Sequence, residues 1–134
     1  MQVFSTACTP LEQSEVPLRQ RVKCVTDQQG FALYFSRAAL PANKSGDIRG
    51  YPPPFSDRPY LLHLGITCLT AAFLQQYAAM PATPLMAMED LEQLKVLENG
   101  YKIKVVTVAH AAFGVDTPED VPLIEARIKA RGLA

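Results

Sequence analysis

The sequence contains no apolar run that approaches the roughly 18 residues needed to cross a bilayer, and it begins with neither a basic stretch nor a long apolar one. We therefore expect no membrane-spanning segment and no secretory signal in this chain. Net charge is also missing, because 13 Lys and Arg balance 13 Asp and Glu. Without excess positive charge the chain lacks the long-range attraction to phosphates that nucleic-acid binders use. A dedicated DNA or RNA binder is therefore disfavoured.

Cysteine is sparse, and the short motifs that bind metals or nucleotides are absent. The three cysteines, Cys8, Cys24 and Cys68, form no C-x-x-C pair, so we expect neither a disulfide framework nor a structural zinc site. This usage is typical of a reducing compartment, and we expect a cytoplasmic protein. Neither glycine-rich phosphate loop, G-x-x-x-x-G-K-[ST] or G-x-G-x-x-G, occurs, so a complete nucleotide site is not expected from these residues.

The 134 residues are suited to one folded domain, because 49% are hydrophobic and only 19% are charged. Segments typical of strands and of helices follow one another, which predicts an α/β fold with three or four strands. Residues 1–20 show no clean period and are expected to form an extended connection. The proline-rich segment 41–59 is expected to be a long loop. The other expected elements are a β-hairpin (21–26 and 31–37), strands at 60–69 and 102–108, and helices at 71–79, 83–99 and from 117.

Two of these elements carry distinctive patterns. Residues 60–69 are almost continuously apolar, as in a strand that is covered on both faces. Residues 83–99 predict one continuous helix, with Thr83 as its cap, Pro84 at its first position and Asn99-Gly100 as its stop.

Asp116 is the first candidate for chemistry, because it follows a predicted strand and precedes a helix that opens with the capping-box pattern of 117–120. Open α/β sheets bind ligands at the carboxyl ends of their strands, so a carboxylate there suits a magnesium ion. The alternative is an aspartate that ties down a turn through its own backbone. Both remain open from spacing alone.

Other candidates have equally ordinary alternatives. Glu92 has apolar neighbours four residues away on the expected helix. It is therefore either partly buried, with polar partners such as the adjacent Gln93, or it reaches solvent at the edge of the apolar helix face. His63 lies in an apolar strand, where a histidine bound to a backbone carbonyl is more usual than a catalytic one. Arg37 ends the hairpin and suits a carboxylate or phosphate, although surface arginines are common. His110 has no second ligand at zinc spacing.

Several segments together resemble a known family. The pattern consists of A-L-Y-F-S-R (32–37), L-H-L-G-I (62–66), P-L (84–85), L-E-Q-L-K-V-L (91–97) and G-V-D-T-P-E-D (114–120). In this order they are similar to the C-terminal half of the CMP-Kdo synthetases, the 3-deoxy-manno-octulosonate cytidylyltransferases. The resemblance covers nearly the whole chain, so residues 1–134 are interpreted as the sugar-acid and dimerisation half of one domain.

The resemblance implies a Rossmann-like α/β/α nucleotidyltransferase sheet with a β-hairpin arm. It implies a homodimer that joins the sugar acid Kdo to CTP with Mg²⁺ and releases pyrophosphate. By the same resemblance Asp116 is the magnesium ligand and catalytic residue. The residues implied to line the sugar-acid pocket are Arg37, His63, Glu92 and Gln93.

The sequence also departs from the family pattern. The family's basic nucleotide loop and second magnesium aspartate have no counterpart here, so we expect this chain alone to be inactive. Met86 replaces the usual acidic residue after Pro84-Leu85, and Thr67-Cys68-Leu69 replaces an aromatic segment. The alternative function is a non-catalytic interaction or sugar-acid-binding module derived from that family.

Overall fold

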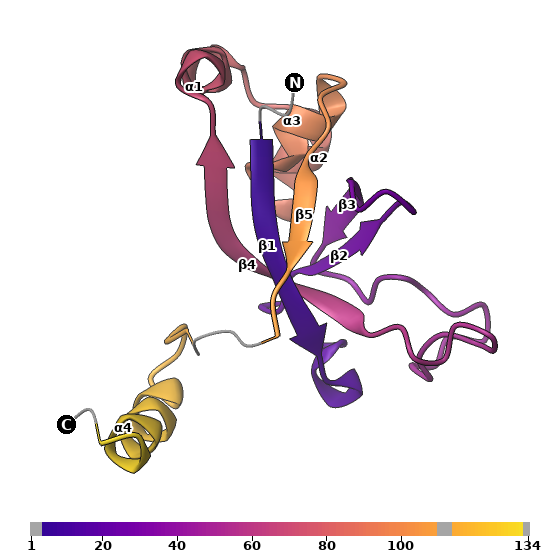
Figure 1. The fold of residues 1–134 in the computed structure, drawn as a ribbon, viewed down its shortest axis with the longest axis vertical. Helices are drawn as coiled ribbons and strands as arrows, with labels where there is room; N and C mark the ends of the chain where they lie inside the picture. Colours follow the sequence, from indigo (N-terminus) through magenta and orange to yellow (C-terminus); the bar gives the residue numbers. More distant parts are fainter. Residues whose placement is uncertain (1–3, 110–113, 133–134) are drawn as a thin grey trace.

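The computed structural model describes residues 4–109 and 114–132, and its strands form one mixed sheet (Figure 1). The order across the sheet is β3-β2-β4-β1-β5, and all neighbours pair antiparallel except β1 and β5, which are parallel. The expected α/β class is confirmed, but the expected number of strands was wrong. The strands are β1 (Phe4–Leu11), β2 (Lys23–Thr26), β3 (Ala32–Ser36), β4 (Tyr60–Leu69) and β5 (Lys104–Thr107). The helices are α1 (Ala71–Ala79), α2 (Pro84–Glu89), α3 (Leu94–Glu98) and α4 (Asp120–Ala130), with a short 3-10 turn at Gln13–Glu15.

The prediction of an extended connection at the N-terminus was wrong, because β1 lies inside the sheet between β4 and β5. Phe4, Thr6 and Cys8 are buried and alternate with less buried residues, which is the period of a strand. Thr6 and Cys8 are too small and polar to make that period obvious in the sequence. Pro10 lies beyond Cys8, the last residue of β1 that pairs with β5, so its missing N–H breaks no bond to that neighbour.

The sheet curls until its two ends meet. Phe31, just before β3, forms an antiparallel bridge with Lys104 of β5. The N–H of Ala32 donates to the carbonyl of Ile103 at 2.9 Å, and the N–H of Val105 donates to the carbonyl of Gly30 at 2.9 Å. The confirmed hairpin of β2 and β3 therefore helps to enclose the core instead of standing apart as an arm.

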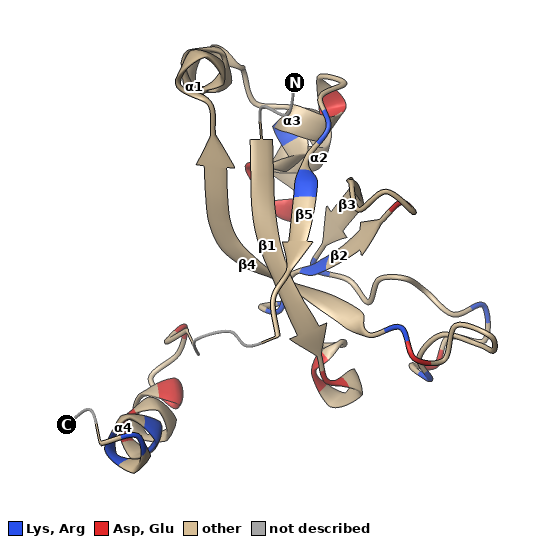
Figure 2. Cartoon of the chain, viewed as in Figure 1, with Lys and Arg blue, Asp and Glu red and all other residues tan. Residues whose placement is uncertain are grey.

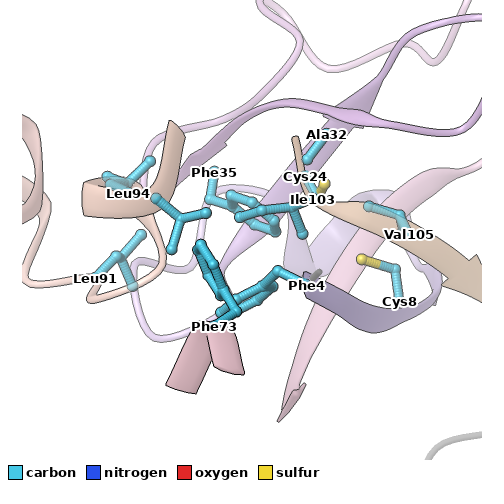
Figure 3. Packing of buried hydrophobic residues seen from close by; sticks show 11 residues of the cluster. Phe4, Cys8, Cys24, Ala32, Phe35, Phe73, Leu91, Leu94, Ile103 and Val105 are labelled. Carbon is cyan, nitrogen blue, oxygen red and sulfur yellow. The ribbon is translucent and has the colours of Figure 1, made fainter. Parts of the chain in front are cut away.

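The main core lies inside this curled sheet and under the helices (Figure 3). Aromatic rings from β1, β3 and α1 pack against aliphatic residues from the α2–α3 region and the β5 segment. Such burial of apolar area is the main stabilising contribution in a domain of this size. The buried residues of this cluster are Phe4, Cys8, Cys24, Ala32, Phe35, Phe73, Leu91, Leu94, Val96, Ile103 and Val105.

A bulge distorts the centre of β4. Thr6 pairs with Thr67 and Cys8 pairs with His63, so three residues of β4 lie opposite the single residue Ala7. Gly65 adopts a φ of +70°, which side chains rarely tolerate, and this frees the strand to bend. Beyond the bulge β4 is exposed, with Ile66 67% accessible, so the prediction of a strand covered on both faces was wrong.

The predicted continuous helix over 83–99 was also wrong, because it breaks after Glu89. Asp90 is left-handed (φ 53°, ψ 52°), and the N–H of Leu91 donates to the carbonyl of Met86 at 3.2 Å. This i to i−5 bond with a left-handed residue is the usual way to end a helix, with aspartate in the place that glycine normally takes. The chain then turns through residues 91–93 before α3 begins.

A clasp between β3 and α2 holds this break in place. The Glu89 carboxylate accepts hydrogen bonds from Ser36 Oγ (2.7 Å) and from the backbone N–H of Arg37 (2.9 Å). In return, Arg37 Nε donates to the Glu89 carbonyl at 2.7 Å. Glu89 is thus held to the end of β3 through both its carbonyl and its carboxylate, and these bonds fix the position of the end of α2.

Two further expectations concern the loop 41–59 and the last helix. No helix or strand interrupts the loop 41–59. The helix expected from 117 begins at Asp120 instead, and its N-cap Glu119 makes no side-chain cap bond. The Asp120 carboxylate accepts from the N–H groups of Asp116 and Thr117 and so closes the turn before the helix. In Figure 1, α4 lies apart from the sheet. The sequence also predicts a turn at 113–116 after the strand at 102–108, but its first residue, Phe113, lies outside the described residues, as does His110. None of the described helices has the length and apolarity to span a membrane.

We expect Glu89→Gln to lower the free energy of unfolding by about 1–2 kcal/mol, because it weakens charge-assisted hydrogen bonds. Burial raises the pKa of Glu89, but the hydrogen bonds from Arg37, Ser36 and Tyr34 outweigh it and hold this pKa below its ordinary value of 4.5. The contribution is therefore complete above pH 4.5 and is lost as the pH falls through the folded-state pKa. Urea unfolding at pH 7 and pH 3.5 measures both effects. Glu125→Gln on exposed α4 is the control, and an equal effect of the two variants would contradict the clasp.

We expect the chain to self-associate through the open side of β4. Beyond His63, the side of β4 opposite β1 pairs with no strand among the described residues, and exposed Ile66 lies on this edge. Unpaired strand edges with apolar residues template further pairing. Ile66→Lys should shift the sedimentation profile toward monomer. Leu123→Lys, a similarly exposed site on α4, should not. A compact monomeric parent at tens of micromolar would refute the expectation.

Candidate functional site

An open cleft of about 500 Å³ lies beside the middle of β4. It gathers four of the five residues that the sequence analysis selected, His63, Glu92, Gln93 and Asp116. A larger hollow of about 810 Å³ in the loop 41–59 contains none of them and is walled mainly by exposed loop residues. The cleft is lined by Gln20, Arg21, Val22, Leu62, His63, Leu64, Gly65, Asp90, Leu91, Glu92, Gln93, Gly114 and Asp116.

His63 stands at the start of the β4 bulge, and its ring has a defined tautomer. The Thr6 hydroxyl donates to the carbonyl of Ile66 at 2.7 Å, so at 2.8 Å from His63 Nε2 it must accept the ring N–H. Nδ1 is then the acceptor and faces the Gln93 amide at 3.5 Å. Burial lowers the pKa of His63 to about 4, so the ring is neutral at physiological pH. Its partner is a hydroxyl instead of the backbone carbonyl that is usual in strands.

Glu92 and Gln93 lie in the turn between α2 and α3, not on a helix as predicted. Gln93 is buried next to His63, whereas the Glu92 side chain is exposed, which agrees with the alternative that placed it at solvent. Tyr77 of α1 donates its hydroxyl to Glu92 Oε2 at 3.0 Å. Burial and this contact raise the pKa of Tyr77 to about 12, so the hydroxyl keeps its proton and stays a donor.

Asp116 is exposed, and it lines the cleft just before α4. Its own N–H donates to Asp120 Oδ2 at 3.0 Å, so the carboxylate of Asp120 ties the turn. The turn is therefore tied by Asp120, and a ligand-binding role for Asp116 stays a prediction. Within the described residues no three His, Cys, Asp or Glu side chains come together to hold a metal ion.

Arg37 is the one selected residue that does not line the cleft. Its guanidinium donates to the carbonyls of Glu89, Asp90 and Arg19 at 2.7, 3.2 and 3.4 Å. These bonds hold the turn that carries Glu92 and Gln93. A role for Arg37 at the ligand remains a prediction, and its contacts here are structural.

The sequence analysis missed two charged residues of the cleft, Asp90 and Arg21. Asp90 lay inside the helix predicted over 83–99, and only its left-handed backbone turns it toward the cleft wall. Arg21 lies two residues before β2 and forms an ion pair with Glu15 at 3.2 Å. A basic residue at a strand end was the available signal. Elsewhere, acidic and basic residues are interspersed along α4 and the loop 41–59, in agreement with the balanced charge (Figure 2).

We expect stability to depend on pH through His63. Its pKa is about 4 in the folded chain and about 6.5 when unfolded. The unfolded state therefore binds more protons between these values, and stability falls as the pH falls from 6.5 toward 4. The expected loss is about 1–2 kcal/mol between pH 7 and pH 5, measured by urea unfolding. His63→Gln should flatten the profile over this range, and an unchanged slope in that variant would contradict the buried neutral ring.

Comparisons with known proteins identify similar sequences. A family model described as "Cytidylyltransferase" matches residues 2–103. The chain is 51% identical over 132 residues to "3-deoxy-manno-octulosonate cytidylyltransferase, mitochondrial" of Arabidopsis thaliana, which covers 98% of this chain and 43% of that protein. It is 53% identical over 131 residues to the 3-deoxy-manno-octulosonate cytidylyltransferase of Zea mays, covering 98% and 42%.

A solved structure gives the same result for the fold. The structure of "CMP:2-keto-3-deoxy-manno-octonic acid synthetase complexed with CTP" matches with a TM-score of 0.80 and 30% identity. The match covers 97% of this chain and 50% of that one, so the mixed sheet is part of a nucleotidyltransferase fold. The chain spans less than half the length of these two plant relatives. With most of its length matched by the family model, the chain belongs to the cytidylyltransferase family.

Proposed function

We propose that these residues form the C-terminal, sugar-acid-binding part of a 3-deoxy-manno-octulosonate (Kdo) cytidylyltransferase. The observation that carries the proposal is the cleft, in which three separate segments place His63, Glu92, Gln93 and Asp116 around one space. The identity of 51% and 53% to plant enzymes of that name supports the choice of substrate.

The cleft has the groups that a polyhydroxy acid requires. Sugar hydroxyls both donate and accept, so they pair with an amide, which does the same, and with a carboxylate, which accepts. Gln93 supplies the amide and Glu92 the carboxylate. His63 is neutral and already hydrogen-bonded to Thr6 and Gln93. It therefore orients the Gln93 amide and shapes the wall of the cleft, and it does not act as a general acid.

In the proposed reaction, a hydroxyl oxygen of the sugar acid attacks the α-phosphorus of CTP, CMP becomes joined to the sugar, and pyrophosphate leaves. Catalysis of such a transfer rests on positioning and on stabilising the phosphate charge. The described residues position the sugar acid. We assign the CTP site to the part of the relatives that this chain does not match, and we propose a homodimer as the assembly.

Asp116 fits a magnesium ion as one ligand of several. Magnesium commonly takes one or two carboxylates and completes its shell with water and substrate phosphate, so a single exposed carboxylate at the cleft suits it. When bound, the ion would neutralise charge on the phosphates. Asp116 would hold it within the cleft that His63 and Gln93 also line.

Pyrophosphate release with CTP, Kdo and Mg²⁺ tests the proposed function. The 134 residues alone should show no turnover, and a chimera joining them to the N-terminal part of the Zea mays relative should be active. A folded chimera that binds Kdo without turnover would favour the binding-module alternative. A chimera that binds no Kdo would refute the proposed function.

Asp116→Asn in the active chimera should lower kcat by about a hundredfold or more, because the variant loses a charge that faces the metal and phosphates. The thermal midpoint should stay nearly unchanged, since Asp120 ties the turn. Glu119→Gln, a charge change three residues away, is the control. Normal turnover of the Asn variant, or its unfolding, would contradict the assignment.

A further inference from the structure

We propose that Arg21 receives the carboxylate of the sugar acid in this cleft. The inference rests on the proposed function, and it assigns the acid group of the substrate to a residue that lies outside the family motifs found in the sequence. Four features of the structure support it.

The first feature is the charge of the cleft. Among the described residues that line it, Arg21 is the one Lys or Arg, whereas Asp90, Glu92 and Asp116 are acidic. His63 adds no positive charge because its ring is neutral. A carboxylate that enters is therefore attracted to one place in the cleft and repelled from the others.

The second feature is an unused donor. Arg21 Nε is buried and has no hydrogen-bond partner among the described residues. A buried N–H without a partner has lost its water without gaining a bond in exchange. A carboxylate that binds side-on to Nε and a terminal nitrogen would satisfy this donor in the two-point geometry that arginine prefers. One terminal nitrogen pairs with Glu15 Oε1 at 3.2 Å, so a bound carboxylate would share the guanidinium with Glu15.

The third feature is a rigid support beneath Arg21. Lys23 is fully buried, and its ammonium donates to the carbonyls of Leu18 (2.9 Å), Arg21 and Arg37 (2.8 Å). The ammonium thereby ties the backbone of Arg21 to the end of β3. A binding group on a backbone held in this way loses little freedom when a ligand arrives.

The fourth feature removes the other candidate. Arg37, which the family resemblance placed in the sugar-acid pocket, directs its guanidinium to three carbonyls and lies outside the cleft lining. Receiving a carboxylate there would break the bonds that hold the turn of Glu92 and Gln93. Arg21 has no such competing task at Nε.

The test compares Kdo with its methyl ester, which keeps the hydroxyls but lacks the charge. Both ligands are titrated calorimetrically into the parent chain, Arg21→Gln and Arg21→Lys at pH 7.5. Arg19→Gln is the matched control, because Arg19 is exposed two residues away and lines no part of the cleft. Thermal unfolding of each variant checks the fold.

The parent should bind Kdo about tenfold or more tightly than the ester, which corresponds to a charge-assisted pair. Arg21→Gln should remove this preference while leaving affinity for the ester nearly unchanged, and Arg21→Lys should retain part of it. Arg19→Gln should resemble the parent. If Arg21→Gln does not fold, the ester preference of the parent and its reduction in Arg21→Lys still decide the question.

Three results would overturn the assignment. If the preference for Kdo over the ester survives in Arg21→Gln, the carboxylate binds elsewhere. If affinity for both ligands falls equally, Arg21 has only a structural role. If the parent binds neither ligand, the proposed function fails, and the role of Arg21 fails with it.

Discussion

The site depends on one reciprocal interaction, the clasp between Glu89 at the end of α2 and the Ser36-Arg37 end of β3. The carboxylate of Glu89 accepts from β3, and the carbonyls of Glu89 and Asp90 accept from the Arg37 guanidinium. Because these two carbonyls accept from Arg37 instead of from later N–H groups of the helix, the helix ends and the chain turns at left-handed Asp90. That turn places Gln93 beside His63 and opens the wall of the cleft.

A second irregularity works with the first from the opposite side. The bulge in β4 leaves the carbonyl of Ile66 without its regular ladder partner, and the Thr6 hydroxyl binds this carbonyl. The same hydroxyl accepts from His63 Nε2, which turns the acceptor Nδ1 toward Gln93. The bulge at Gly65 and the hydroxyl of Thr6 thus fix the orientation of the His63 ring. Both irregularities lie where functional side chains gather, as is common for bulges and strained residues.

Local patterns in the sequence were sufficient for the elements that are stabilised locally. The hairpin, the loop 41–59 and α1 follow from turn residues, prolines and caps, whereas α4 forms but begins at Asp120, later than the predicted cap. The break after Glu89 depends on Arg37, which is distant in sequence, so the uninterrupted apolar period over 83–99 could not reveal it. β1 was missed because Thr6 and Cys8 hide its period. For the site, the resemblance selected His63, Glu92, Gln93 and Asp116, whereas Arg21 and Asp90 enter the cleft only through tertiary structure.

The motif Y-F-S-R shows why a family pattern does not by itself give each residue a role. Tyr34, Ser36 and Arg37 all reach Glu89, the first through its hydroxyl at 3.4 Å. Phe35, between them, packs its ring edge-on against His63 with centroids 4.9 Å apart. All four residues therefore shape the walls of the cleft, and none of them lines it. A motif of this kind is recognisable because each of its side chains has a defined partner. The need for one particular side chain is as strict at a supporting position as at a position that touches substrate. In our proposal the positive charge that meets the ligand lies outside the motif, at Arg21, where a terminal nitrogen pairs with Glu15 and Nε has no hydrogen-bond partner among the described residues.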